Sequence, residues 1–249
     1  MSTSWVVLPG LAEAPEEFAE VVSLLPDDDL HVVDAWRTPI TAPVEALRES
    51  SGVTVPVGLV GHSIGGLAAL RWTLTHPGEI DRLVLVDSSL TSETGWRWLY
   101  PGTRGDRLVR SVLRVLGRIG VPGLLGTSVW RAFVWVGSIR KSSSLPRATV
   151  RDRFGAADSW LLFWDELAGS WALAAEVAKL LESVPDRLPP AIVLVATGGS
   201  SRFTAKSWLA GQRALAAQLR ATVEVLPDSA HLVHLDRPDA IAKAVTNLA

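Results

Sequence analysis

One serine and one histidine stand out as the residues most able to do chemistry. Ser63 lies in Gly61-His62-Ser63-Ile64-Gly65, which fits the pattern G-x-S-x-G. An apolar run precedes the pattern and a stretch with helical spacing follows it, so we expect a tight strand-to-helix turn that exposes the serine hydroxyl. Glycine is expected at both ends of the pattern because neighbouring backbone passes close by. Such a serine is suited to nucleophilic attack on an acyl carbon.

The second residue, His231, lies near the other end of the chain, between an apolar run that ends at Leu226 and a final helix that begins at Pro238. A histidine in such a loop can take the proton of the attacking serine and later return it to the leaving group. We interpret the other four histidines as packing or surface residues: His31, His62, His76 and His234.

Together, the serine turn and the histidine loop resemble the α/β-hydrolase superfamily, over nearly the whole chain outside residues 91–189. The resemblance implies a mostly parallel central sheet flanked by helices, and catalysis through an acyl-serine intermediate. It also implies that two backbone amides hold the oxyanion, those of Ile64 and of Leu11. Leu11 follows Pro9-Gly10, where many relatives carry His-Gly.

The acid that should orient His231 is missing from its usual place in this family, just after the strand expected over Ala191 to Ala196. Residues 197–202 contain no carboxylate. In one alternative Asp87, which is 24 residues beyond Ser63 (87 − 63), is the acid. Some thioesterases and dehalogenases resemble this arrangement, and the carboxyl ends of neighbouring parallel strands share one rim.

Three other interpretations of the missing acid stay open. Asp87 could be a carboxylate that only ties a loop. Ser200, Ser201 or a backbone carbonyl could orient the histidine in a dyad. Hydrolysis could also have been lost, leaving a pocket that binds a ligand. Asp34, at the end of another strand, is interpreted as structural.

The elements that must position these residues alternate between strands and helices, which is typical of an α/β fold with a parallel sheet. Strands are expected over Trp5 to Leu8, Leu30 to Val33, Val55 to Val60, Arg82 to Val86, Ala191 to Ala196 and Thr222 to Leu226. Helices are expected over Pro15 to Leu25, Pro43 to Glu49, Leu67 to Thr75, Ala205 to Leu219 and Pro238 to Leu248.

Residues 91–189 interrupt this alternation and predict a helical cap, with residues 1–90 and 190–249 forming the hydrolase core. Seven tryptophans fall in the insertion and would favour a hydrophobic substrate where they face the pocket. They are Trp96, Trp98, Trp130, Trp135, Trp160, Trp164 and Trp171.

A row of arginines marks one helix of the insertion: Arg107, Arg110, Arg114 and Arg118, with Leu108, Val112, Val115 and Ile119 on the opposite side. The arginines could meet an anionic acyl carrier or a lipid surface. A solvated helix face is the interpretation that we favour.

Composition excludes several other classes. The 249 residues are 48% hydrophobic and 20% charged, with a net charge of −2, which does not suit a nucleic-acid-binding protein. There is no cysteine, so disulfides and thiolate metal sites are excluded. No metal or cofactor motif is found. The chain starts without a signal-peptide pattern, and glycines, a proline and an arginine break residues 119–137, so we expect no membrane span and a cytoplasmic location.

The sequence therefore predicts a carboxylesterase-like serine hydrolase acting on a small or medium hydrophobic ester. Ser63 would attack, His231 would act as acid and base, and Asp87 would be the third member. Related alternatives are a thioesterase or cyclase, a carbon–carbon bond hydrolase and a cofactor-free perhydrolase. The alternative from another class is a non-catalytic ligand-binding protein with the same fold.

Overall fold

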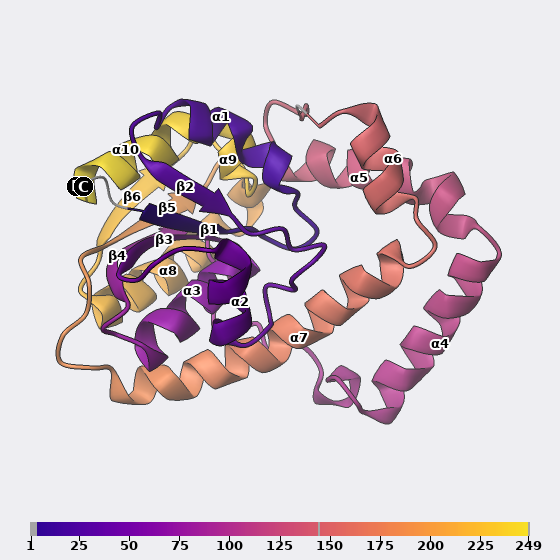
Figure 1. Ribbon diagram of the computed structural model, residues 1–249, viewed down its shortest axis with the longest axis horizontal. Helices are drawn as coiled ribbons and strands as arrows, with labels where there is room; N and C mark the ends of the chain where they lie inside the picture. Colours follow the sequence, from indigo (N-terminus) through magenta and orange to yellow (C-terminus); the bar gives the residue numbers. More distant parts are fainter. Residues whose placement is uncertain (1–3, 144, 249) are drawn as a thin grey trace.

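The computed structural model describes residues 4–143 and 145–248 and contains a six-stranded parallel sheet (Figure 1). The first three residues and the last residue of the expected core lie outside the described residues. The strand order is β2-β1-β3-β4-β5-β6. The strands are β1 (Ser4–Leu8), β2 (Asp29–Val32), β3 (Val57–His62), β4 (Ile80–Val86), β5 (Ala191–Ala196) and β6 (Thr222–Leu226).

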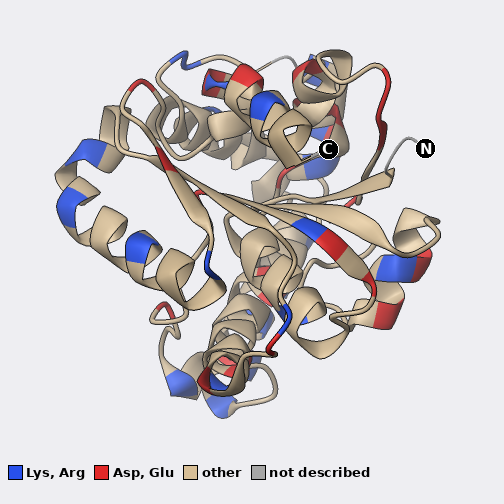
Figure 2. Cartoon of the chain, turned by 90° about the vertical axis from the view of Figure 1, so that its left-hand side faces the viewer, with Lys and Arg blue, Asp and Glu red and all other residues tan. Residues whose placement is uncertain are grey.

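Helices cover both faces of the sheet (Figure 2), which explains why its central strands are almost continuously apolar. Val6 and Leu8 of β1 point to one face, and Trp5 and Val7 point to the other. The first face packs against α2 (Val44–Ser51), α3 (Ile64–Thr75) and α8 (Ala205–Leu219). The second packs against η1 (Pro15–Phe18), α1 (Ala19–Ser23), α9 (Val233–Asp236) and α10 (Pro238–Leu248).

The predicted fold class is confirmed, and the expected strands β5 and β6 have the predicted bounds. The strand expected over Val55 to Val60 instead begins at Val57. Proline has no amide hydrogen for the sheet, so Pro56 cannot donate to a neighbouring strand. The single helix expected over Pro15 to Leu25 is a short 3-10 helix followed by α1.

Between β4 and β5 the described part of the chain is helical, with no strand. This segment contains η2 (Arg97–Leu99), α4 (Arg104–Arg118), α5 (Val121–Gly137), α6 (Arg147–Phe154), α7 (Ser159–Leu180) and η3 (Leu181–Ser183). Helix α7 joins the core, where Leu173, Ala174 and Val177 are buried. Helix α4 lies at the edge of the molecule opposite the chain termini (Figure 1). Among the described residues, no helix is long and apolar enough to cross a membrane.

Candidate active site

Ser63 occupies the sharp turn between β3 and α3. Its backbone has φ 52° and ψ −121°, a conformation that is strained for a residue with a side chain. The turn passes so close to its surroundings that a Cβ at Gly65 would lie 2.0 Å from the Leu8 carbonyl oxygen. A Cβ at Gly61 would lie 2.6 Å from the carbonyl oxygen of Gly65. Glycine is therefore required at both ends of the motif, as the sequence predicted.

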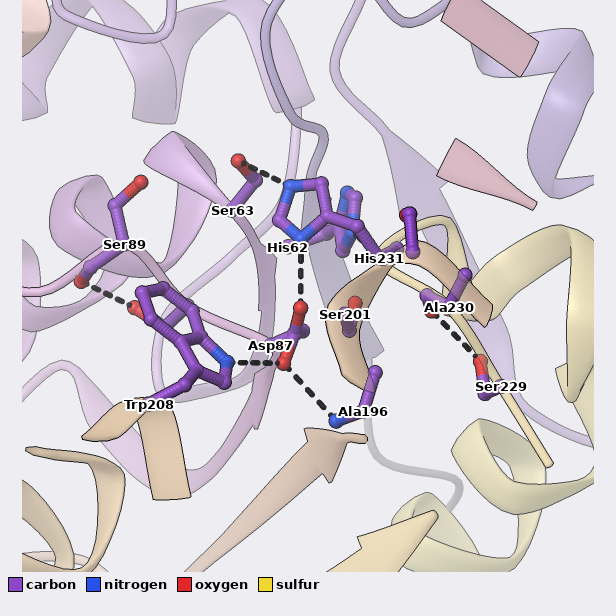
Figure 3. A network of polar contacts seen from close by, with 12 residues as sticks. His62, Ser63, Asp87, Ser89, Ala196, Ser201, Trp208, Ser229, Ala230 and His231 are labelled. Atoms are coloured by element: carbon purple, nitrogen blue, oxygen red, sulfur yellow. Dashed lines mark hydrogen bonds and ion pairs between the residues drawn. The ribbon is translucent and has the colours of Figure 1, made fainter. Parts of the chain in front are cut away.

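The structure brings the three predicted catalytic side chains together in one row of hydrogen bonds (Figure 3). The hydroxyl oxygen of Ser63 lies 3.0 Å from Nε2 of His231. On the other side of the ring, Nδ1 lies 2.6 Å from Oδ2 of Asp87. Asp87 is 1% exposed. A buried carboxylate on Nδ1 holds the proton there and leaves Nε2 free to accept a proton from the serine.

The second carboxylate oxygen of Asp87 is also fully engaged. Oδ1 accepts hydrogen bonds from the Ala196 amide, at 3.0 Å, and from the Trp208 indole Nε1, at 2.7 Å. These donors come from the end of β5 and from α8 (Figure 3). Asp87 therefore ties β5 and α8 to the end of β4 and contacts His231 at the same time. Its contacts agree both with a carboxylate that ties a loop and with one that orients the histidine.

The other candidates from the sequence do not contact the imidazole ring of His231. The hydroxyl of Ser200 donates to the Val136 carbonyl oxygen, at 2.6 Å. Ser201 lines a surface hollow together with Asp87 and His231, and among the described residues it makes no hydrogen bond to the ring. Asp34 accepts from Arg153, at 2.8 Å, and so links the end of β2 to α6, which agrees with its structural interpretation.

A buried cluster next to His231 was missed by the sequence analysis. His62, the residue before the serine, contacts the backbone carbonyl oxygen of His231 through Nε2, at 2.8 Å. Its Nδ1 lies 2.7 Å from the carboxylate of Glu13, which also accepts the Gly10 amide. His234 stacks on Phe18 beside them. Glu13 and His62 thus connect the loop after β1 to the loop that carries His231.

Electrostatics favour an ion pair between Glu13 and His62. Burial is the largest influence on each group and opposes its charge, but each lies beside the opposite charge of the other. The balance lowers the pKa of the Glu13 carboxyl and raises the pKa of the His62 imidazole. Burial lowers the pKa of His234 to about 4, so this ring is neutral near pH 7.

Glu13, His62 and His234 also form the one group of side chains in the described parts of the chain that is spaced closely enough to hold a metal ion. The contacts argue for the ion pair, because Glu13 and His62 bind each other and each also hydrogen-bonds one backbone group. These groups are the Gly10 amide and the His231 carbonyl oxygen. We therefore assign the cluster no metal.

Ser63 and His231 open into a cavity of about 260 Å³. Leu11 and Ile64, whose amides were predicted to hold the oxyanion, also line it. Its other walls include five residues of the 91–189 segment: Glu93, Phe133, Leu167, Ser170 and Trp171. The serine therefore faces a chamber that is enclosed mainly by apolar side chains.

A second cavity of about 360 Å³ lies deeper in the helical segment, and Phe133 borders both cavities. Val109 and Leu113 of α4 form part of its wall. Its aromatic lining consists of Trp36, Trp130, Phe133, Phe154, Trp160, Phe163 and Trp164. Three of the seven tryptophans in the insertion thus line this cavity, and Trp171 lines the first.

Comparison with protein families matches residues 6–244 to a family described as the alpha/beta hydrolase family. A mouse protein named sn-1-specific diacylglycerol lipase ABHD11 is 27% identical over 227 residues, covering 88% of this chain and 67% of the relative. A cis-3-alkyl-4-alkyloxetan-2-one decarboxylase from Xanthomonas campestris pv. campestris is 26% identical over 216 residues, covering 81% of this chain and 66% of the relative. The chain thus spans about two thirds of the length of both.

Solved structures show the same fold at low identity. An alpha/beta hydrolase fold protein from Burkholderia ambifaria has a TM-score of 0.72 and 16% identity, with 99% of this chain and 91% of the other covered. The enol-lactonase from Burkholderia xenovorans LB400 has a TM-score of 0.62 and 18% identity, with 100% and 91% covered. At such identity the likeness concerns the fold alone.

Proposed function

The chain belongs to the alpha/beta hydrolase family, and from this premise we propose that it is a serine hydrolase that cleaves carboxylic esters with a hydrophobic acyl group. The observation that carries the proposal is the hydrogen-bonded row of Ser63, His231 and Asp87, whose serine and histidine open into a cavity with leucine and aromatic side chains in its walls. Fold alone would not carry it, because one fold supports many activities.

The proposed reaction has two steps. The Ser63 oxygen attacks the acyl carbon while Nε2 of His231 takes the hydroxyl proton, and the bond from that carbon to the alcohol oxygen then breaks as His231 protonates the alcohol. Water next attacks the acyl-serine and gives its proton to His231, which returns it to Ser63 as the acid leaves. Asp87 holds the imidazolium in place throughout.

Two further parts complete the proposal. The amides of Leu11 and Ile64 hold the oxyanion; Ile64 is the first residue of α3, where amide hydrogens have no partner within the helix. Residues 91–189 act as a cap on a core formed by residues 1–90 and 190–249. Support comes from Phe133, Leu167 and Trp171, which lie across the cavity from the core.

The side chains of residues 91–189 favour a substrate with a hydrophobic acyl group. The cavity beyond Phe133 is lined almost entirely by aromatic and aliphatic side chains, which suit a hydrocarbon chain. Two relatives carry names of enzymes that act on alkylated or acylated compounds, in keeping with this preference. A thioester would react by the same steps, and no contact distinguishes it.

Labelling with a fluorophosphonate probe tests the proposal. We expect rapid labelling of the wild type, and no labelling of Ser63→Ala or His231→Ala. Ser89→Ala is the matched control, because Ser89 lines the same cavity without contacting His231; it should be labelled like the wild type. A panel of p-nitrophenyl esters with increasing acyl length then measures turnover. A folded wild type that takes no label and turns over no ester would instead support the ligand-binding alternative.

A further inference from the structure

Helix α4 exposes an apolar stripe to solvent. Its inward side is used, since Val109 and Leu113 line the second cavity. Its outward side carries apolar residues at intervals of four, three and four positions, which places them in one line along the helix. These residues are Leu108, Val112, Val115 and Ile119, and each is between 50% and 66% exposed.

Further exposed apolar residues lie close along the chain to both ends of α4. Only Ile119 and Gly120 separate α4 from α5, whose first turns expose Leu124 and Leu125. At the other end, the exposed rings of Trp96 and Trp98 stack with 6.5 Å between their centroids. We call this surface the α4 face and define it as Trp96, Trp98, Leu108, Val112, Val115, Ile119, Leu124 and Leu125. Exposed apolar residues that gather in one region mark an interaction surface more often than scattered ones do.

The α4 face lies in the most basic part of the chain. Residues 97–151 contain eleven arginines and lysines and one acidic residue, Asp106, so their net charge is +10 (11 − 1). The whole chain has a net charge of −2, which leaves −12 (−2 − 10) for all other residues. Three exposed arginines of α4 form a row about a third of a turn around the helix from the apolar stripe: Arg107, Arg114 and Arg118. Arg110 lies in the same row but pairs with Asp106 and Asp165 within the protein.

We propose that the α4 face docks on an anionic lipid surface. A helix with an exposed apolar side and arginines on one adjoining side is suited to lie in the plane of a membrane interface, with its apolar side among the acyl chains and its cations reaching anionic headgroups. Tryptophans such as Trp96 and Trp98 favour this boundary as well. This inference concerns binding and does not depend on the proposed hydrolysis.

The composition of the face favours lipid over two protein partners. An acidic carrier protein would satisfy the arginines but leave the aliphatic stripe uncovered. A second copy would cover the stripe but bring two +10 segments together, which like-charge repulsion opposes. Docking by α4 would also place the second cavity directly behind the membrane-facing helix, since Val109 and Leu113 belong to both.

Vesicle flotation tests the proposal on the full chain. The vesicles consist of non-hydrolysable diether phosphatidylcholine, alone or with about 30% anionic diether phosphatidylglycerol, so that turnover cannot remove the lipid. We expect the wild type to float with the mixed vesicles and at least ten-fold less with the neutral ones. Val112→Asp/Val115→Asp should reduce partitioning by about ten-fold or more, because each valine loses its place in the apolar layer. Arg114→Glu/Arg118→Glu should reduce it by at least about twenty-fold on mixed vesicles only, at about five-fold per basic residue near the surface.

Matched controls keep the result specific. Leu24→Asp changes an exposed apolar residue just after α1, away from the α4 face. Arg213→Glu reverses an exposed charge on α8. Both variants should float like the wild type. Thermal unfolding checks that the α4 variants are folded. We expect them to fold, because the substituted side chains are exposed and pack little against the rest of the protein. Flotation of no protein would overturn the proposal. So would a dimer in size-exclusion chromatography that Val112→Asp/Val115→Asp dissociates without any change in flotation, because a second copy would then occupy the face.

Discussion

Replacing Asp87 by asparagine would test the catalytic row with almost no change in shape. Oδ1 of Asp87 accepts two hydrogen bonds, from the Ala196 amide and the Trp208 indole. The single carbonyl oxygen of an asparagine must therefore take this position, and its NH₂ group then faces Nδ1 of His231. Two donors cannot share that contact, so the ring would move its proton to Nε2. Nε2 would then donate toward Ser63 and could not accept the serine proton.

The expected loss is large and falls on kcat. A histidine held in the wrong tautomer lowers kcat by about 10⁴-fold. At about 1.36 kcal/mol for each factor of ten, this raises the barrier by about 5 kcal/mol. KM should change little, because Asp87 is not among the residues that line the cavity beside Ser63. Substitution by alanine is less informative, since it would also leave the Ala196 and Trp208 donors without an acceptor.

Steady-state kinetics with p-nitrophenyl butyrate and the rate of fluorophosphonate labelling would measure the effect. Asp34→Asn is the matched control, because Asp34 also ends a strand but contacts Arg153 rather than a histidine. It should keep the wild-type kcat within assay error. A folded Asp87→Asn that retains more than one tenth of the wild-type kcat would refute the reasoning, and another group would then orient His231.

Three further variants test other parts of the structure. Glu13→Gln should lower the free energy of unfolding by about 3 kcal/mol, because it leaves His62 buried without its carboxylate; chemical denaturation measures this. It should also lower kcat, and an unchanged kcat would limit the pair to stability. Burial raises the pKa of Glu166 from 4.5 to about 7, so the folded state retains a proton that the unfolded state loses. The contribution of Glu166 to stability should therefore be greatest below pH 4.5 and fall by up to about 3 kcal/mol as the pH rises through 7. Thermal melts of Glu166→Gln should show a shallower fall, and an unaltered slope would contradict the assignment. Phe133→Ala should join the two cavities and shift kcat/KM toward longer acyl chains, while Phe203→Ala, on an exposed turn, should not; equal profiles in the ester panel would argue against the second cavity as an acyl site.

Much of the fold could be predicted because local patterns determine it. The apolar strands, the glycine-rich turn at Ser63 and the helices from Ala205 and Pro238 are each encoded within a short stretch of sequence. Element ends were less accurate where one residue changes the outcome, as Pro56 does for β3. Whether an apolar stripe is covered depends on distant elements. The stripe on α4 was therefore visible in the sequence, but its exposure was not.

The cluster behind the histidine could not be predicted in the same way. His62 was visible beside the serine, but nothing nearby in the sequence marks its partners. Glu13 lies 49 residues earlier (62 − 13), and the His231 carbonyl lies 169 residues later (231 − 62). Only the folded sheet brings the loop after β1 next to the histidine loop. A glutamate shortly after a Pro-Gly turn is a weak signal, because most such glutamates are exposed.

The position of Asp87 follows from the order of the strands. β4 and β5 are adjacent and parallel, with Val86 paired to Leu194, so both strands end at the same rim, and neighbouring strands lie only about 4.8 Å apart. An acid at the end of β4 thus lies only one strand spacing from the position of an acid at the end of β5. Here the end of β5 provides the Ala196 amide, and α8 provides the Trp208 indole, as donors to the carboxylate. Under the proposed mechanism the turn after β5 can lack an acid, because the last residue of β5 helps to hold the carboxylate that follows β4.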